Sequence, residues 1–161
     1  MKNILGLINA RAGSKMIKNK NIKILCGHPL IAWSIKTALK SKLLTDVIVS
    51  TDSKKISKIS NDYGAKTPFI RPKKLASDNA KQFDSILYAL KKLKEQGKVY
   101  DAVMLLQPTF PLRLVTDIDK SINLMSASEA DTIISVTKSN SNLPFTLYSK
   151  AKDNQMNALF N

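Results

Sequence analysis

The chain of 161 residues contains very little cysteine and no long apolar run. Its single cysteine, Cys26, excludes an intramolecular disulfide and is typical of a protein in a reducing compartment. No apolar stretch approaches the length of a membrane span, and the N-terminus opens into strand-like sequence without a secretory signal pattern. These absences favour a cytoplasmic protein with no membrane partner.

Acidic residues are scarce as well: 12 Asp and Glu stand against 26 Lys and Arg, which gives a net charge of +14. Such an excess can indicate a nucleic-acid-binding module. The lysines are spread over the whole length, however, and no aromatic residues alternate with a basic cluster. We therefore interpret the excess as compositional bias with a mild attraction for anions, and we expect no nucleic-acid partner.

Arginine is the third scarce residue, since only Arg11, Arg71 and Arg113 occur among the 26 basic residues. Arginine carries a planar cation with several hydrogen-bond donors, which lysine cannot replace. All three arginines lie in loops near the ends of predicted strands. A chain that uses lysine for nearly all of its positive charge is expected to place its few arginines where that planar group is needed.

The first of these arginines lies in a loop of small and basic residues that follows a short apolar run at residues 4–8. The loop at residues 10–15 reads Ala-Arg-Ala-Gly-Ser-Lys. Small residues let backbone N–H groups approach an anion, and the cationic side chains close around it. Gly-Ser-Lys turns also occur as plain surface loops, so the loop alone is compatible with either interpretation.

Apolar periodicity predicts an alternation of strands and helices. The predicted strands are residues 4–8, 47–50, 67–70, 102–106 and 132–136, and the predicted helices are residues 30–41, about 54–63, 83–96 and 116–126. Strands separated by helices of this length predict an α/β fold with a parallel sheet and helices on both faces. Ligands of such sheets bind beyond the carboxyl ends of the strands, where the loops after residues 8, 49, 70 and 106 converge.

Several motifs then follow one another in the order seen in the CMP-sialic acid synthetases, the acylneuraminate cytidylyltransferases. They are the loop at 10–15, Lys20-Asn21, Pro29-Leu30-Ile31, Val49-Ser50-Thr51-Asp52, Arg71-Pro72, Leu75-Ala76-Ser77-Asp78 and Leu105-Leu106-Gln107-Pro108-Thr109. The chain resembles this family over residues 3–137. The resemblance implies a Rossmann-like nucleotidyltransferase fold, a three-layer sandwich with a mostly parallel sheet. Residues 1–137 would be the nucleotide-binding core, and residues 138–161 would begin an incomplete C-terminal and dimerisation region.

The same resemblance implies a reaction. Family members transfer CMP from CTP to a nonulosonic (sialic-type) acid by in-line attack of the sugar's anomeric hydroxyl on the α-phosphorus, with release of pyrophosphate and with Mg²⁺ as cofactor. A CTP-sugar synthetase of the 3-deoxy-manno-octulosonate type is an alternative in the same class. An inactive nucleotide-binding remnant and a nucleic-acid-binding module are the alternatives from other classes.

Family roles transfer to matching positions of this sequence. The resemblance implies that Arg11 and Lys15 are catalytic residues, which hold the CTP phosphates and stabilise charge on the pyrophosphate leaving group. It implies that Gln107 lies near the sugar acceptor. The positions that would bind CTP are Ser14, Lys20, Asn21, Arg71, Ala80 and Gln82. Asp52 ends a predicted strand, and we expect it to cap the following helix.

Departures from the family pattern accompany these matches. Asn9 stands where the family often has proline, and Lys81-Gln82 where it usually has two serines. The family's Asp-x-Asp metal motif and dimerisation segment have no counterpart, so we assign no residue to a metal. Metal-assisted transfer needs such carboxylates. We therefore expect this chain alone to be inactive or nearly so, and to be a monomer or a weak dimer with an exposed apolar edge at residues 143–145.

Overall fold

The computed structural model describes residues 3–14, 16–138, 148–151 and 155–158. The chain divides into two compact units, Met1–Glu129 and Ala130–Asn161. The sequence-based division after residue 137 stays a prediction. Two other predictions, the catalytic role of Lys15 and the exposed edge at residues 143–145, fall on positions outside the described residues.

A three-stranded parallel sheet with the order β4-β1-β5 forms the centre of the first unit. Strand β1 (Ile4–Asn9) pairs on one side with β4 (Asp46–Ser50) and on the other with β5 (Ala102–Leu105). Beyond β4, two isolated bridges, at Lys66 and Ile70, hold a further extended segment parallel to the sheet. Only these bridges form in the region of the strand predicted at 67–70. Pro68 lies between them and has no N–H to donate to a ladder.

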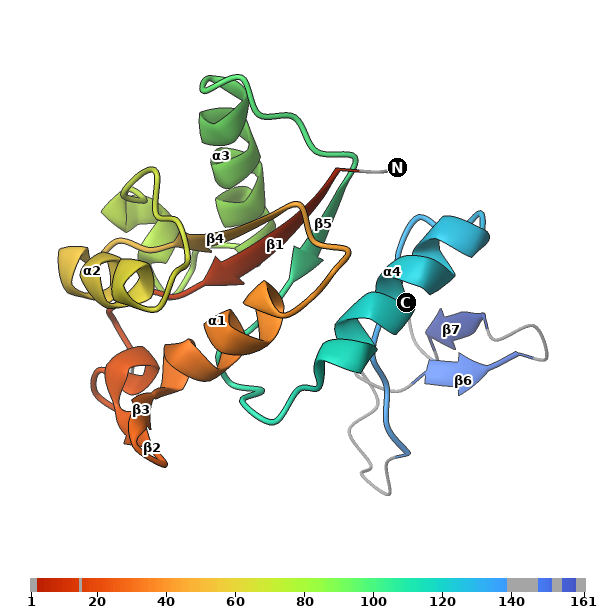
Figure 1. The fold of residues 1–161 in the computed structure, drawn as a ribbon, viewed down its shortest axis with the longest axis horizontal. Coiled ribbons are helices and arrows are strands. Elements are labelled where there is room, and N and C mark those ends of the chain that lie inside the picture. Colours follow the sequence, from red (N-terminus) through yellow and green to blue (C-terminus); the bar gives the residue numbers. More distant parts are fainter. Residues whose placement is uncertain (1–2, 15, 139–147, 152–154, 159–161) are drawn as a thin grey trace. The chain divides into compact units, whose positions relative to one another are not determined.

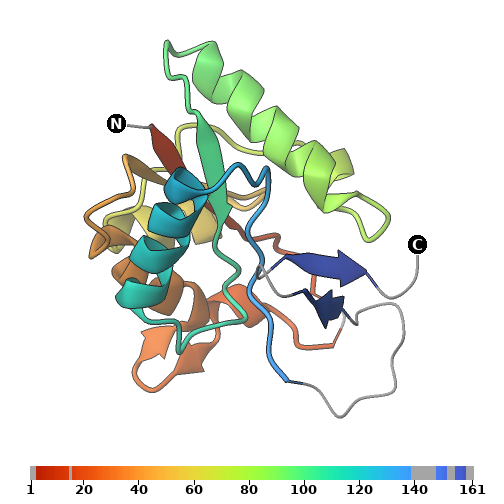
Figure 2. The same cartoon turned by 90° about the vertical axis from the view of Figure 1, so that its right-hand side faces the viewer.

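Helices cover both faces of this sheet (Figure 1, Figure 2). They are α1 (Leu30–Leu39), α2 (Lys54–Asp62), α3 (Gln82–Lys94) and α4 (Val115–Ala127). Successive side chains of a strand point to opposite faces. Ile4 and Ile8 of β1 accordingly pack in one cluster with residues of α1, α2 and α4, whereas Leu5 and Leu7 pack with α3. The result is the three-layer α/β sandwich that the sequence predicted.

Shorter elements connect the layers. The 3-10 turn η1 (Lys20–Ile22) and a hairpin of β2 (Ile24–Leu25) and β3 (His28–Pro29) lie between β1 and α1, and a second 3-10 turn, η2 (Lys73–Ala76), precedes α3. Cys26 and Gly27 make the hairpin turn with φ of 47° and 80°. Two consecutive positive φ values are typical of the tight turns that match the twist of paired strands. The sequence predicted a turn at this point but not the hairpin.

The described part of the second unit contains an antiparallel pair, β6 (Tyr148–Lys150) and β7 (Met156–Ala158). The prediction of a strand at residues 132–136 is wrong, because these residues form no ladder with any described strand. A β-type composition indicates that a segment fits a sheet, but a strand forms only where another backbone is available to pair with it. Among the described residues, no helix is both long and apolar enough to span a bilayer.

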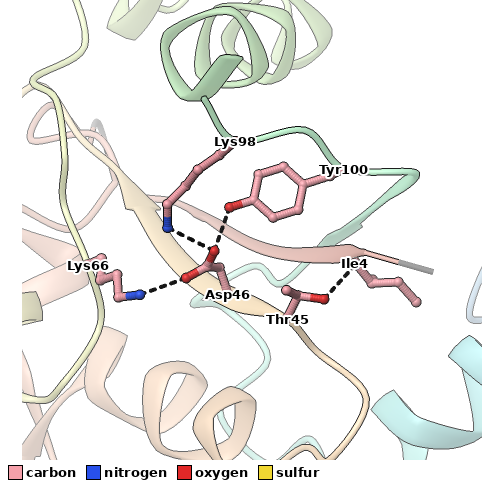
Figure 3. A network of polar contacts seen from close by, with 6 residues as sticks. All are labelled: Ile4, Thr45, Asp46, Lys66, Lys98 and Tyr100. Atoms are coloured by element: carbon pink, nitrogen blue, oxygen red, sulfur yellow. Dashed lines mark hydrogen bonds and ion pairs between the residues drawn. The ribbon is translucent and has the colours of Figure 1, made fainter. Parts of the chain in front are cut away.

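At the edge of the sheet where β4 and β5 begin, Asp46 is surrounded by donors (Figure 3). Its carboxylate accepts hydrogen bonds from Lys66 Nζ (2.8 Å), Lys98 Nζ (2.9 Å) and Tyr100 Oη (2.7 Å). Burial by itself raises the pKa of Asp46, but these hydrogen bonds outweigh it and lower the pKa to about 2. Burial and the bond to Asp46 raise the pKa of Tyr100. We call this group of four residues the amino-edge network.

Candidate functional site

The candidate site is a cavity of about 340 Å³ at the carboxyl ends of the strands. Four chain segments meet there: the loop after β1, the residues after Ile70, the N-terminal turn of α3 and the loop after β5. Ligands of open parallel sheets bind at this edge, because the loops after neighbouring strands converge on it. The fold therefore brings the predicted motifs into one place.

Eight of the nine residues that the sequence assigned to a site line this cavity. They are Arg11, Ser14, Lys20, Asn21, Arg71, Ala80, Gln82 and Gln107. The ninth, Lys15, is outside the described residues. Arg113 is not among the lining residues. The roles of the eight in binding or catalysis stay predictions, but their assembly in one cavity is what a nucleotide site requires.

Backbone and side-chain contacts fix the start of the loop after β1. Ala10 is fully buried, and its N–H donates to the Ser50 carbonyl at 3.0 Å, which continues the pairing of β1 with β4. The N–H of Ala12 donates to Asp52 Oδ1 at 2.8 Å. Asn21, which is buried, donates its amide to the Arg11 carbonyl at 2.9 Å. These three bonds hold the small-residue loop against the sheet edge before any ligand is bound.

The expectation that Asp52 caps the next helix is corrected by these contacts. Asp52 accepts from the loop at Ala12, and Ser53 is the residue that caps α2, where its hydroxyl accepts from the Ile56 N–H at 3.3 Å. The carboxylate thus ties the end of β4 to the loop after β1. Neighbouring strand ends are joined by a contact that spans 40 residues of sequence.

Arg11 extends across the cavity mouth to the segment that leads into α3. Its Nη2 pairs with Asp78 Oδ1 at 2.8 Å, and its Nη1 donates to the Ala76 carbonyl at 3.4 Å. The side chains of Arg11 and Asp78 are 36% and 43% exposed, so water screens this ion pair. An anionic ligand can compete with a carboxylate held in this way.

Arg71 is the buried cation of the cavity, with only 4% of its surface exposed. Its backbone N–H donates to the Thr51 carbonyl at 2.8 Å, and Nη1 donates to Asn9 Oδ1 at 3.4 Å, but Nε has no partner among the described residues. Burial lowers the pKa of Arg71, the nearby Arg11 lowers it further, and Asp52 opposes both. A buried cation without a contacting carboxylate is costly unless a ligand completes its environment.

Polar groups also cover the cavity wall near α3. Asn9 Nδ2 donates to Ser85 Oγ at 3.3 Å, and Ser85 in turn donates to the Gln82 carbonyl at 2.7 Å. On the side of β5, the exposed Gln107 accepts through its side chain from the Thr109 hydroxyl at 3.4 Å. The lining of the cavity thus combines cations with neutral amide and hydroxyl groups.

Three residues of this arrangement were missed as site residues: Asn9, Asp52 and Ser85. Asn9 is a polar residue at the last position of β1, next to the loops that converge at the carboxyl edge, and this position could have singled it out. Asp52 follows directly after a strand in the same way. Ser85 gives no signal in the sequence, because a serine in the first turn of a helix is common.

A Mg²⁺ site held by protein carboxylates does not fit the described lining of the cavity. Mg²⁺ prefers oxygen ligands in octahedral geometry. Asp78 is the only carboxylate among the described lining residues, and it is paired with Arg11. Elsewhere among the described residues, no group of three or more His, Cys, Asp or Glu side chains could hold a metal ion.

A second, more open hollow of about 560 Å³ lies along α2 and residues 67–70. It contains Lys54 and Lys58 but none of the loops that follow β1 or β5. It is larger than the cavity, but of the two only the cavity contains a buried cation, Arg71, beside the loops that follow β1 and β5. The chemistry therefore favours the cavity as the candidate site.

The chain is similar in sequence to known proteins. The family model described as "Cytidylyltransferase" matches residues 5–160. A CMP-N,N'-diacetyllegionaminic acid synthase from Legionella pneumophila is 43% identical over 110 residues, 68% of this chain and 47% of the relative. An N-acylneuraminate cytidylyltransferase from Escherichia coli is 40% identical over 85% of this chain and 32% of its own length. A pseudaminic acid cytidylyltransferase from Campylobacter jejuni is 42% identical over 70% of this chain and 48% of its own.

Solved structures share the fold. A CMP:2-keto-3-deoxy-manno-octonic acid synthetase complexed with CTP superposes with a TM-score of 0.67 at 20% identity, over 80% of this chain and 49% of that one. A 4-diphosphocytidyl-2C-methyl-D-erythritol synthase from Anaerococcus prevotii superposes with a TM-score of 0.63 at 19% identity, over 96% of this chain and 63% of that one. This chain spans about half the length, or less, of the three curated relatives.

Proposed function

We propose that this chain, which belongs to the cytidylyltransferase family, forms the CTP-binding core of an enzyme that transfers CMP from CTP to a nonulosonic (sialic-type) acid. The observation that carries the proposal is the cavity at the carboxyl edge, where Arg11, Lys20 and Arg71 line about 340 Å³ beside a small-residue loop. A triphosphate is the kind of ligand that supplies the missing negative charge. The relatives named for CMP-sugar synthesis support the choice of CTP.

The proposed roles follow from where the cations lie. Arg11 and Lys20, at the mouth and in the loop after β1, contact the phosphates together with Lys15, and Ser14 and Asn21 complete this part of the site. Preorganised donors aimed at developing charge are worth more in a cavity than in water. Stabilising charge on the pyrophosphate is therefore the main contribution of these residues to the reaction.

Four further lining residues complete the proposed site. Arg71, Ala80 and Gln82 bind the nucleoside part of CTP from the side of α3, and Gln107 faces the sugar acceptor from the loop after β5. Apart from the guanidinium of Arg71, the wall near α3 offers neutral amide and hydroxyl groups, and these support the division. Neutral polar groups suit the edge of a base better than a phosphate.

The proposed reaction is an in-line displacement at the α-phosphorus. The anomeric hydroxyl oxygen of the sugar forms a bond to the α-phosphorus and loses its proton, while the bond from the α-phosphorus to the α–β bridging oxygen breaks and pyrophosphate leaves. Positioning and charge stabilisation supply most of such catalysis.

The exposed thiol of Cys26 and the absence of a disulfide among the described residues fit a reducing cytoplasm, where we expect the protein to act.

For the sugar acid that accepts CMP, we propose a chemical class and not a single compound. The names of the three relatives refer to three different acceptors, a diacetyllegionaminic acid, an N-acylneuraminate and pseudaminic acid. All are nine-carbon 2-keto acids, so the shared chemistry is a carboxylate beside the anomeric hydroxyl. The proposal is for this class of sugar acid.

Calorimetric titration with CTP, ATP and GTP tests the nucleotide site. We expect CTP to bind preferentially and Arg11→Ala to weaken binding by about fivefold or more, because a hydrogen bond to a charged group is lost. Lys15→Ala should act in the same direction. Lys66→Ala is the matched control, since it removes one positive charge at the amino-edge network and should leave CTP affinity unchanged. Unchanged affinity in both Arg11→Ala and Lys15→Ala would contradict the assignment of the loop.

Pyrophosphate release tests the transfer step. The assay contains CTP, Mg²⁺ and N-acetylneuraminate or legionaminate. Because we expect this chain alone to be inactive or nearly so, CTP binding with little or no pyrophosphate release is the expected result. Turnover that requires both CTP and the sugar acid would demonstrate the proposed reaction and contradict the expected inactivity of this chain. Salt-sensitive binding of nucleic acid with no preference for CTP would contradict the proposal altogether.

A further inference from the structure

The guanidinium of Arg71 is held in the cavity wall by very few contacts. Arg71 is 4% exposed. Within the described part of the chain, its Nε has no partner, and the hydrogen bond from Nη1 to Asn9 Oδ1 (3.4 Å) is the contact that orients its side chain. Asp52 acts on Arg71 through its charge, while its Oδ1 accepts from the Ala12 N–H. The direction in which the buried cation presents its free donors therefore depends on Asn9.

Asn9 is itself fixed from its other side. Ser85 uses its hydroxyl hydrogen to donate to the Gln82 carbonyl at 2.7 Å, so its oxygen can only accept from Asn9. The amide nitrogen of Asn9 must then face Ser85, at 3.3 Å, and the amide oxygen faces Arg71. The chain of bonds runs from α3 through the end of β1 to Arg71. It determines the amide orientation without reference to any ligand.

Asn9 accepts from Arg71 without adding negative charge. A carboxylate at the same place would hold the guanidinium more tightly and would also neutralise it toward a ligand. A neutral amide orients the cation and leaves its charge available, while nearby Arg11 adds a second positive charge to the same cavity.

We propose that Asn9 is a positioning residue of the nucleotide site, which through its bond to Ser85 holds the guanidinium of Arg71 in the orientation that binds CTP. The effect on CTP rests on the proposed function, whereas the orientation of Arg71 by Asn9 does not. Asn9 acts through Arg71 and makes no energetic contribution to CTP binding once Arg71 is removed.

A double-mutant cycle measures this dependence. The CTP dissociation constant is determined by calorimetry for the wild type, Asn9→Leu, Arg71→Ala and the double variant, at CTP concentrations that saturate the weakest binder. Leucine has nearly the size of asparagine and no acceptor. We expect Asn9→Leu to weaken CTP binding about fivefold in the wild type, the range of one ordinary hydrogen bond, and to have no further effect beside Arg71→Ala.

Asn123→Leu is the matched control, because Asn123 lies exposed on α4 and undergoes the same change of side chain. It should leave the dissociation constant unchanged. Equal CTP affinity in Asn9→Leu and the wild type overturns the proposal. An equal loss with and without Arg71 also overturns it, because Asn9 would then act on the ligand directly.

A second measurement needs no nucleotide. In ¹⁵N-labelled protein, we expect the Nε–Hε signal of Arg71 to be sharp in the wild type, broadened in Asn9→Leu and sharp again in Asn9→Asp, which restores the acceptor and keeps the shape. If the Nε–Hε signal of Arg71 is lost in Asn9→Asp, the proposal that an acceptor at residue 9 positions Arg71 is contradicted. This comparison of Asn9→Asp with the wild type can be made even if Asn9→Leu does not fold. If the signals behave as expected but the wild type does not bind CTP, the proposed function fails and the orientation of Arg71 by Asn9 stands.

Discussion

The amino edge of the central sheet, where its strands begin, and the carboxyl edge, where they end, use positive charge in opposite ways. At the amino edge, the carboxylate of Asp46 accepts from Lys66, Lys98 and Tyr100, and its side chain is only 13% exposed (Figure 3). At the carboxyl edge, Arg71 is buried, its Nε has no partner in the part of the chain that the structure describes, and the pair between Arg11 and Asp78 is open to water. At the amino edge the charged groups are paired, whereas at the carboxyl edge some hydrogen-bond donors have no acceptor among the described residues.

This difference separates stability from function within a single strongly basic chain. Paired charges at the amino edge stabilise the start of β4, since each donor has its acceptor. Unpaired donors at the carboxyl edge cost stability unless a ligand supplies their acceptors. Substitutions at the amino edge should therefore change folding, and those at the carboxyl edge should change binding.

The largest expected effect is the loss of stability in Asp46→Asn. The amide cannot accept from two lysines and a tyrosine as the carboxylate does, and Lys98 and Tyr100 lose charge-assisted bonds. We expect the free energy of unfolding to fall by about 3 kcal/mol, with the exposed Lys66 contributing little of it. Urea denaturation measures the change. CTP affinity should remain that of the wild type, and a parallel loss of affinity would show that the two edges are coupled.

The second expected effect is the pH dependence of the same group. The pKa of Asp46 lies at about 2 in the folded protein against an ordinary value of 3.8. Its ionisation thus stabilises the fold above about pH 4, and this contribution, about 2 kcal/mol, is lost as the pH falls toward 2. The difference in unfolding free energy between wild type and Asp46→Asn should become smaller as the pH is lowered from about 6 to about 2. A difference that is constant over this range contradicts the lowered pKa.

The third expected effect is the reverse pattern in Arg71→Met. Methionine fills much of the same volume and removes a buried, incompletely paired cation. CTP affinity should fall about tenfold, while the unfolding free energy should change by less than about 1 kcal/mol. Lys98→Met is the matched substitution at the amino edge, where we expect lower stability and unchanged affinity. A large loss of stability in Arg71→Met without a loss of affinity would remove the distinction between the edges.

The smallest expected effect is a gain in affinity from Asp78→Asn. The carboxylate competes with an anionic ligand for Arg11, but the pair is exposed and therefore weak. We expect CTP to bind about twofold more tightly, with stability changed by less than about 0.5 kcal/mol. Calorimetry and urea denaturation of the same samples measure both quantities. Weaker binding in Asp78→Asn would show that the carboxylate supports the site and does not compete with the ligand.

Local sequence patterns determined most of the fold. Apolar periodicity marked all three strands of the central sheet and all four long helices to within a few residues. The strand predicted at 132–136 failed, because periodicity reports the faces of a segment and not the presence of a neighbour to pair with. Motif order placed Arg11, Arg71 and Gln107 in loops that the fold does bring to one cavity.

Which of the many charged groups are paired depends on the three-dimensional fold and cannot be read from the sequence. Asn9 meets Arg71 across 62 residues of sequence and Ser85 across 76, and Asp46 meets Tyr100 across 54. No local pattern encodes such contacts, because they depend on strand order and on where each loop returns to the sheet. The positions of the cations along the chain are a property of the sequence alone. The order β4-β1-β5 places some of them beside a carboxylate and others in the lining of the cavity.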